Sequence, residues 1–240
     1  MVKLIRKAVR SLGFDVVRYP PKPPGWKGDY LKLLSNYNID LIFDIGANTG
    51  QYAEETFGLG YTGKIVSFEP MSKEHAQLVS KAGANPHWTI APRMAIGDED
   101  GEIEINISEN SVSSSILPLT EYTMETSPLT RYVGKEKTAI ARLDTIAGQY
   151  LKNYTNLFVK IDVQGYEAHV LKGAMSSIDK IKGLHIEFSL QPLYDREVNM
   201  MAIMNKVHEL GFRPHYFMPH ITIDKIGRML QVDGIFFRTS

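Results

Sequence analysis

The stretch Phe43-Asp-Ile-Gly-Ala-Asn-Thr-Gly-Gln51 decides the fold of this chain. It begins within a short apolar run from Leu41, carries Asp44 inside that run, and then passes through two glycines. A short apolar run is typical of a strand buried on both faces, and Gly46 and Gly50 let the backbone turn and approach a ligand closely. A carboxylate inside an apolar strand needs a partner. The stretch therefore predicts a buried strand, a ligand-binding turn and a helix.

The same alternation of strand and helix continues along the chain. Strands are expected at residues 41–44, 64–69, 88–96, 157–162, 184–188, 212–217 and 234–238. Helices are expected at residues 29–34, 49–57, 72–81, 166–172 and 200–210, with Asn48 and Ser72 as N-caps of the second and third. This alternation predicts a doubly wound α/β domain with a mostly parallel sheet. No helix precedes the last strand, which predicts one antiparallel strand near the C-terminus.

Two segments depart from that alternation. Ile103, Ile105 and Ile107 alternate with polar residues, which predicts a half-exposed antiparallel strand at residues 101–108. Residues 109–137 show no periodicity and are expected to form a long loop, of a length that usually belongs to a lid or to disorder. Its serines either touch a ligand or are simply flexible: Ser111, Ser113, Ser114 and Ser115.

The composition and the N-terminal region limit the partners. Lys and Arg number 27 and Asp and Glu number 27, so no net field favours nucleic acid. Residues 1–28 are predicted to form a basic amphipathic helix and a proline-rich linker, followed by one domain at residues 29–240. That helix either packs on the domain or on a second copy in a homo-oligomer, or residues 1–18 rest on a membrane surface. The lack of cysteine, of a signal peptide and of a long apolar run favours a cytoplasmic protein.

The glycine-bearing turn suggests which cofactor is bound. A dinucleotide site would carry Gly-x-Gly-x-x-Gly, and here Asn48 stands at the second glycine, where it crowds the path of a pyrophosphate. A cofactor with an amino-acid end fits better. In S-adenosylmethionine, Asp44 and the turn with Gly46 and Gly50 would receive the methionine part. Glu69, at the end of the next strand, would accept hydrogen bonds from the two ribose hydroxyl groups.

Several ordered motifs between residues 40 and 238 resemble the FkbM-type methyltransferases. They are Phe43-Asp-Ile-Gly-Ala-Asn-Thr-Gly50, Phe68-Glu-Pro70, Ala95-Ile-Gly-Asp98, Lys160-Ile-Asp-Val-Gln-Gly-Tyr-Glu167 and His185-Ile-Glu-Phe-Ser189. The resemblance implies a class I methyltransferase fold with a seven-stranded sheet, S-adenosylmethionine as cofactor, and methyl transfer to a hydroxyl oxygen. It places Pro70 beside the cofactor and Asp98 at its adenine end. Sugars, glycans and natural-product hydroxyls are the implied acceptors.

Two further acids fall at strand ends where a ligand of this fold would lie. Asp162 and Glu187 could act together as general base and orienting group, or hold a divalent cation. Asp162 could instead cap the next helix, and Glu167 could serve the site or only complement that helix's dipole. His185, two residues before Glu187, either relays a proton or packs in the sheet.

The main hypothesis is therefore an S-adenosylmethionine-dependent O-methyltransferase. Two alternatives remain from the sequence. A nicotinamide-dependent oxidoreductase shares the order of glycine turn and ribose acid, but Asn48 disfavours it. The second is a non-catalytic binding protein on the same fold, and the presence of Asp44, Glu69, Asp162 and Glu187 argues against it.

Overall fold

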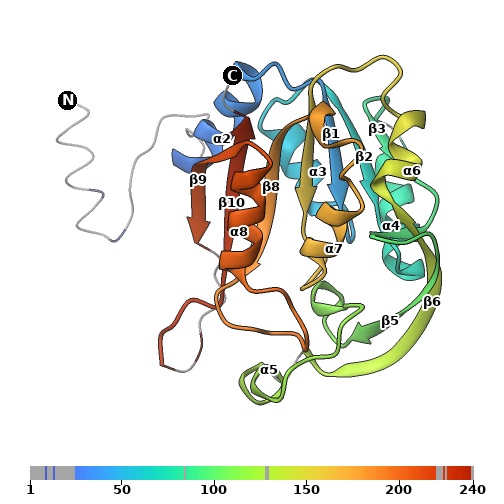
Figure 1. Cartoon of the computed structure of the whole chain (residues 1–240), viewed down its shortest axis with the longest axis vertical. Coiled ribbons are helices and arrows are strands. Elements are labelled where there is room, and N and C mark those ends of the chain that lie inside the picture. Colours follow the sequence, from blue (N-terminus) through green and yellow to red (C-terminus); the bar gives the residue numbers. More distant parts are fainter. Residues whose placement is uncertain are drawn as a thin grey trace.

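A seven-stranded sheet forms the centre of the molecule (Figure 1). The computed structural model describes residues 25–83, 85–127, 130–219, 224 and 226–238, together with Val9 and Gly13. The strand order is β3-β2-β1-β7-β8-β10-β9, and β10 runs antiparallel to both of its neighbours while the other pairs are parallel. The strands are β1 (Leu41–Ile45), β2 (Lys64–Phe68), β3 (Trp88–Ile90), β7 (Leu157–Ile161), β8 (Ile181–Ser189), β9 (Phe212–Pro219) and β10 (Gln231–Arg238). The predicted fold class, with one antiparallel strand near the C-terminus, is confirmed.

Helices cover both faces of this sheet and create two apolar layers. The first face packs against α2 (Gly25–Asn36), α3 (Gln51–Gly58) and α4 (Ser72–Ala82). The second face packs against α6 (Leu143–Ile146), α7 (Glu167–Lys172) and α8 (Met200–Glu209). The central strands β1 and β7 are buried along their whole length, as expected for short apolar runs between two helical layers.

A row of polar side chains crosses the face that α2 and α3 cover. Ser67, Asp44, Lys160 and His185 are register partners on β2, β1, β7 and β8. Two residues earlier in the first three of these strands, the equivalent positions are apolar and belong to the core. The row therefore marks where the apolar core ends and a polar region begins, towards the carboxyl ends of the strands.

A second, smaller sheet corrects one prediction and confirms another. β4 (Met94–Gly97), β5 (Gly101–Ser108) and β6 (Tyr132–Arg142) form a three-stranded sheet in the order β4-β6-β5. The single strand predicted at residues 88–96 is thus two strands in different sheets. The antiparallel strand at residues 101–108 is confirmed as β5, which pairs with β6.

The long loop predicted at residues 109–137 is wrong. That segment contains the short helices η1 (Ser111–Ser113) and α5 (Glu121–Thr126), and it enters β6 at Tyr132. β6 was not predicted because only Thr138 and Ile140 are buried among its side chains, so no apolar alternation appears before these two residues. In Figure 1, β5, β6 and α5 lie beyond the carboxyl ends of the parallel strands.

The N-caps of α3 and α4 differ from prediction, whereas the glycines expected to end α4 and α8 lie where predicted, and α2 is longer at both ends than the predicted helix at residues 29–34. The N-cap of α3 is Gly50, in the left-handed region, and Asn48 belongs to the preceding turn. The N-cap of α4 is Met71, one residue before the predicted Ser72. Gly83 follows α4, and Gly211 lies just beyond α8, as predicted.

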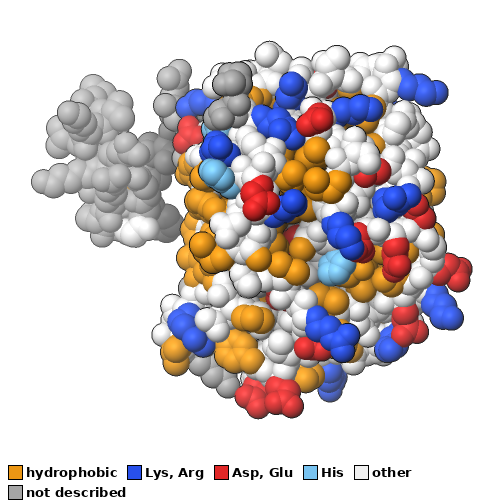
Figure 2. All heavy atoms as spheres, in the orientation of Figure 1, with side chains coloured by type: hydrophobic (Ala, Val, Ile, Leu, Met, Phe, Trp, Pro, Cys, Tyr) orange, Lys and Arg blue, Asp and Glu red, His pale blue; other side chains and the backbone are white. Residues whose placement is uncertain are grey.

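The predicted basic helix and proline-rich linker lie almost wholly outside the described residues and stay predictions. None of the helices in the described part of the chain has the length and apolar character needed to cross a bilayer. On the face shown in Figure 2, Lys and Arg side chains are interspersed with Asp and Glu.

Candidate active site

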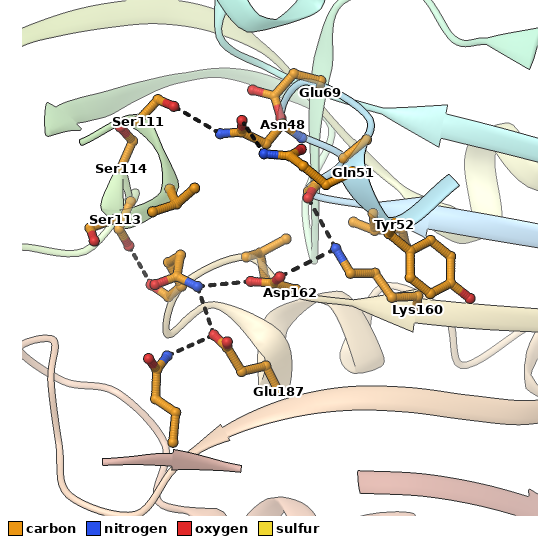
Figure 3. A pocket seen from close by; sticks show the side chains of 18 of the residues that line it. Asn48, Gln51, Tyr52, Glu69, Ser111, Ser113, Ser114, Lys160, Asp162 and Glu187 are labelled. Carbon is orange, nitrogen blue, oxygen red and sulfur yellow. Dashed lines mark hydrogen bonds and ion pairs between the residues drawn. The ribbon is translucent and has the colours of Figure 1, made fainter. Parts of the chain in front are cut away.

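One large cavity opens at the carboxyl ends of the parallel strands, where ligands of doubly wound folds bind (Figure 3). Its volume is about 980 Å³, at the upper end of the range for small-molecule sites. Its walls come from the β1–α3 turn, the end of β2, strand β4, residues 110–116, and the ends of β7, β8 and β10. The cavity therefore joins the predicted cofactor turn to the two predicted carboxylates.

The glycines of the turn serve close packing more than approach of a ligand. A Cβ on Gly46 would lie 1.8 Å from the main-chain oxygen of Asp162, and one on Gly50 would lie 2.6 Å from the ring of Trp88. Both glycines also have left-handed φ values, 76° and 91°. Gly46 lines the cavity, whereas Gly50 is not among its lining residues. The expectation that both glycines open space for a ligand is thus corrected, because their missing side chains let β7 and β3 approach the turn.

The main-chain N–H groups of this turn are all engaged within the protein. Gly46 and Ala47 donate to the oxygen of Phe68 at 3.1 and 3.0 Å, and Gly50 donates to Ala47 at 2.8 Å. Asn48 donates to Oε2 of Glu69, and Thr49 donates to the side chain of Asn48, both at 2.8 Å. Five consecutive N–H groups, from residue 46 to residue 50, therefore have acceptors in the protein itself.

Glu69 lies at the centre of this end of the cavity. It is 2% exposed, and its second oxygen accepts the N–H of Met71 at 2.9 Å. Burial raises the pKa of Glu69 to about 7, although the two N–H donors oppose the rise. Asn48 also reaches across the cavity, where its Nδ2 donates to the hydroxyl of Ser111 at 3.2 Å. Pro70, directly after Glu69, lines the cavity as well.

Asp44 is not a lining residue, because it lies beneath the cavity behind Lys160. It is fully buried, 3.3 Å from Nζ of Lys160, and it accepts the hydroxyl of Ser67 at 3.1 Å. Burial raises the pKa of Asp44, and the charge of Lys160 opposes that rise. The buried carboxylate thus has the partner that the sequence required.

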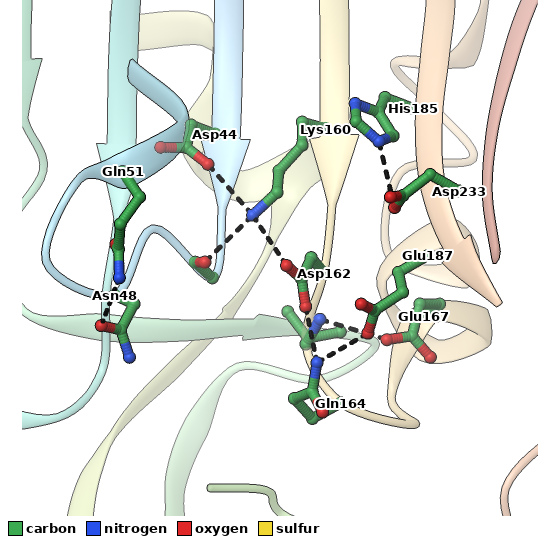
Figure 4. Close-up of polar contacts among 12 residues, drawn as sticks. Asp44, Asn48, Gln51, Lys160, Asp162, Gln164, Glu167, His185, Glu187 and Asp233 are labelled. Carbon is green, nitrogen blue, oxygen red and sulfur yellow. Dashed lines mark hydrogen bonds and ion pairs between the residues drawn. The ribbon is translucent and has the colours of Figure 1, made fainter. Parts of the chain in front are cut away.

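Lys160 connects the two ends of the cavity (Figure 4). Its Nζ lies 3.3 Å from Asp44, 3.3 Å from Asp162 and 3.1 Å from the oxygen of Gly46, to which it donates. Burial alone would lower the pKa of Lys160, but the carboxylates of Asp162 and Asp44 outweigh burial and raise it. The ammonium group therefore stays charged between two acids.

A chain of amides continues from Asp162 to Glu187 and beyond. Nε2 of Gln164 donates to Asp162 at 2.8 Å and to Oε2 of Glu187 at 2.6 Å. The same Oε2 accepts Nε2 of Gln231, from β10, at 2.7 Å. Asp162 thus does not cap α7, and the structure brings the two predicted carboxylates together, as Figure 4 shows.

Glu187 lies in an environment that raises the pKa of its carboxyl group. It is 6% exposed and lines the cavity. Burial, and then the negative charges of Asp162, Asp233 and Glu167, raise its pKa well above the usual value, with Lys160 opposing them. A carboxylate with a raised pKa takes up a proton more readily, as a general base must.

His185 lies one layer deeper than Glu187, and its side chain is 12% exposed. Its Nε2 is 3.2 Å from Oδ1 of Asp233, and its ring meets those of Tyr30 and Tyr52 edge-on at 6.2 and 5.9 Å. All four residues line the cavity. His185 is thus paired with Asp233, and its predicted role in a proton relay to Glu187 stays a prediction.

Asp98 and Glu167 lie outside the cavity lining. Asp98 forms an ion pair with Lys172 at 2.7 Å, and this contact lowers its pKa although burial alone would raise it. Its position lends no support to the predicted adenine contact. Oε1 of Glu167 accepts the N–H groups of Val163 and Gly165, both at 3.1 Å, so Glu167 holds the turn after β7.

Sequence reasoning did not select three residues that the structure places among the site's key contacts. They are Lys160, Gln164 and Gln231. A lysine in the apolar strand at residues 157–161 was an available signal, because a buried lysine needs a carboxylate partner. Gln164 and Gln231 carried no such signal, since an amide beside a turn or in a strand is unremarkable until the topology is known. Ser111, Ser113, Ser114 and Ser115 do line the cavity.

Within the described ranges, no three or more His, Asp or Glu side chains are grouped as a metal site would require. Asp162 and Glu187 share one amide donor, Nε2 of Gln164.

Comparison with known proteins gives one family and several relatives. The model of the methyltransferase FkbM domain matches residues 44–214. The 2-O-methyltransferase NoeI of Sinorhizobium fredii (strain NBRC 101917 / NGR234) is 26% identical over 172 residues, which cover 69% of this chain and 70% of NoeI.

Solved structures with a related arrangement are more distant. Magnesium protoporphyrin IX methyltransferase (ChlM) from Synechocystis PCC 6803 has a TM-score of 0.46 at 11% identity, covering 98% of this chain and 80% of that one. An rRNA methylase from Streptococcus thermophilus has a TM-score of 0.46 at 12% identity, covering 91% and 98%.

Proposed function

Because this chain belongs to the FkbM methyltransferase family, we propose that it transfers the methyl group of S-adenosylmethionine to a hydroxyl oxygen of a sugar, glycan or natural-product acceptor. One observation carries the proposal. A single cavity of about 980 Å³ contains Glu69 and the glycine turn at one end, and Asp162 and Glu187 at the other. Cofactor and acceptor can therefore meet within it.

The cofactor end suits an amino-acid nucleoside better than a dinucleotide. A pyrophosphate on a glycine turn needs free N–H donors, but residues 46–50 direct theirs to Phe68, Glu69, Asn48 and Ala47. This arrangement argues against the nicotinamide alternative. Glu69 is ready to accept the ribose hydroxyls, because each of its oxygens has a single N–H donor in the protein and retains acceptor capacity.

The acceptor end suits removal of a proton from a hydroxyl group. S-adenosylmethionine supplies an electrophilic methyl group on sulfur. Ionised Glu187 would accept the hydroxyl proton at its carboxylate as the methyl–oxygen bond forms and the methyl–sulfur bond breaks, which leaves S-adenosylhomocysteine; the raised pKa makes that carboxylate a stronger base. Asp162, held by Lys160 and Gln164, would orient the acceptor by accepting a hydrogen bond from a second hydroxyl group of the acceptor. Alignment of the two reactants in this cavity supplies a large part of the rate enhancement.

The acceptor class rests on two kinds of support. NoeI is named a 2-O-methyltransferase, which makes oxygen the expected site of transfer in a relative at 26% identity. The cavity also presents paired carboxylates, amides and serine residues, which suit an acceptor with several hydroxyl groups.

The cofactor is tested by thermal unfolding of the full chain with S-adenosylhomocysteine, with NAD, and without ligand. At about 100 times its dissociation constant a ligand adds about 2.7 kcal/mol, which raises the Tm of a chain this size by about 5–10 °C. We expect this shift with S-adenosylhomocysteine alone, and its loss in Glu69→Ala. A shift with NAD instead, or none with either ligand, would overturn the proposal.

The acceptor is tested by transfer of radiolabelled methyl from S-adenosylmethionine to a panel of methyl glycosides, glycans and hydroxylated natural products. Compounds that offer only a carboxylate, which would give a base-labile methyl ester, or only an amine serve as negative controls. Label on a hydroxyl oxygen supports the proposal, and label on a carboxylate or nitrogen alone would contradict it. The Glu187→Gln variant should retain binding of S-adenosylhomocysteine but lose transfer.

A further inference from the structure

Gln164 contacts several residues of the candidate site at once, through its side-chain amide and its main-chain oxygen. Its Nε2 donates to Asp162 and Glu187, and its Oε1 accepts the hydroxyl of Tyr194 at 2.8 Å. Its main-chain oxygen accepts the hydroxyl of Ser115 at 2.6 Å. One residue thus joins both carboxylates to the serine-bearing segment that walls the cavity.

These contacts allow only one orientation of the amide. The NH2 group faces two carboxylate oxygens, and the carbonyl oxygen faces the hydroxyl of Tyr194. With the amide reversed, Oε1 of Gln164 would face both carboxylates as a third acceptor, and no hydrogen would lie between them. The hydroxyl of Tyr194 therefore keeps both N–H bonds of Gln164 directed at the carboxylates.

The backbone at this position is also unusual. Gln164 has a φ of 56°, in the left-handed region, and Gly165 follows with a φ of 94°. A Cβ on Gly165 would lie 2.8 Å from the ring of Tyr194, so the turn is pressed against that side chain. Glu167 binds the N–H groups on both sides of Gln164. A residue held in this region by several neighbours is a common feature of functional sites.

From these contacts we propose that Gln164 is a positioning residue: it holds Asp162 and Glu187 in the orientation that an acceptor hydroxyl requires, and Tyr194 holds Gln164. The proposal rests on the proposed function and adds to it a residue that itself touches neither the methyl group nor its acceptor. The charged groups around Glu187 are Lys160 from β7, Asp162 directly after β7, Glu167 from α7 and Asp233 from β10.

The test follows the pKa of Glu187 in the full chain by NMR of 13C-labelled glutamate carboxyls, assigned with Glu187→Gln. It requires no ligand and no acceptor. Gln164→Met keeps the size of the side chain but removes its donors, so the pKa of Glu187 should rise by about one unit. Gln77→Met, on the exposed face of α4, is the matched control and should leave it unchanged.

Two further variants separate positioning from simple packing. Tyr194→Phe should raise the pKa of Glu187 by about half a unit when it is made in the parent chain. Made in addition to Gln164→Met, it should leave that pKa unchanged, because Tyr194 acts through Gln164. Gln231→Met removes a second donor to the same oxygen of Glu187, so it should raise the pKa of Glu187 both in the parent chain and in Gln164→Met. An unchanged pKa in Gln164→Met, or additivity of Tyr194→Phe with it, would overturn the proposal.

Gln164→Glu covers the case in which Gln164→Met fails to fold. The added negative charge beside Glu187 should raise its pKa by more than Gln164→Met does. A parent chain that fails to bind S-adenosylhomocysteine would refute the proposed function without touching this titration. A normal cofactor shift with an unmoved Glu187 would refute only the role of Gln164.

Discussion

The two ends of the cavity are built in different ways. The cofactor end lies within residues 44–71, on two consecutive strand–helix units, and its contacts are mostly main-chain hydrogen bonds. The acceptor end collects residues 110–116, 160–164, 185–187 and 231–233, and side-chain amides hold it together. Main-chain contacts are insensitive to most substitutions, whereas an amide bridge is lost with one. We therefore expect most side-chain substitutions at the cofactor end to be tolerated, except at Glu69 and Gly46, whereas loss of one amide at the acceptor end should break its contacts.

The sharpest separation of the two ends comes from Glu187→Gln. Loss of the general base should lower kcat for methyl transfer by about 1000-fold. Calorimetry with S-adenosylhomocysteine should show a Kd within about twofold of the parent's, because Glu187 lies at the opposite end of the cavity. An equal loss of cofactor affinity would show that the two ends are not separate.

Gly46→Ala tests the close contact between the turn after β1 and the main chain of Asp162, where the two ends of the cavity meet. Its Cβ would meet the main-chain oxygen of Asp162 at 1.8 Å in a left-handed backbone, so the free energy of unfolding should fall by about 3 kcal/mol or more. Urea denaturation measures the change. Gly58→Ala, at the end of α3 with open space around it, is the control and should be neutral or slightly stabilising. Equal stability of the two variants would contradict the close approach described here.

Glu69→Ala tests the cofactor end alone. Removing the predicted ribose acceptor should weaken S-adenosylhomocysteine binding by about 100-fold, as expected for loss of hydrogen bonds to a charged group. Titration calorimetry gives the value. At saturating cofactor, the kcat of Glu69→Ala should fall far less than the kcat of Glu187→Gln. An equally large fall would contradict the assignment of Glu69 to cofactor binding alone.

The smallest expected effect concerns the turn beneath the acceptor end. Burial raises the pKa of Glu167 from 4.5 to about 8. A raised folded-state pKa means that the folded chain binds the extra proton, so its contribution is full below pH 4.5 and is lost as the pH rises towards 8. From pH 6 to pH 8 the loss is about 2 kcal/mol.

Glu167→Gln should flatten this pH dependence. The amide oxygen can still accept the N–H groups of Val163 and Gly165, and it does not ionise. Urea denaturation at pH 6 and pH 8 compares the two chains, with Glu99→Gln on the exposed surface as the control. An unchanged slope in Glu167→Gln would place the ionisation elsewhere.

The contrast between the two ends also explains what the sequence could predict. The strand, turn and acid around Asp44, Gly46 and Glu69 are neighbours in sequence as well as in space, so their pattern predicted the fold class and the cofactor end. Asp162 and Glu187 were selected because both are acids at strand ends. Gln164 and Gln231 are 67 residues apart, and only the pairing of β8 with β10 brings Gln231 to Glu187.

Exposure explains the remaining error. β6 has few buried side chains, so the hydrophobic period that identifies strands is missing and the segment resembled a loop. The roles of Gly46 and Gly50 were misjudged for another reason. A sequence shows that a side chain is absent, but only the three-dimensional neighbours, Asp162 and Trp88, show what occupies the space.

The polar row of Ser67, Asp44, Lys160 and His185 has a consequence for folding itself. A slip of one residue in any of these four strands would turn its polar side chain into the apolar layer under α6, α7 and α8, and leave the others without partners. Buried ionic groups add little net stability, but they strongly penalise such misalignment. The row therefore helps to specify strand register: the four strands pair without a large free-energy penalty only in the register that also assembles the cavity.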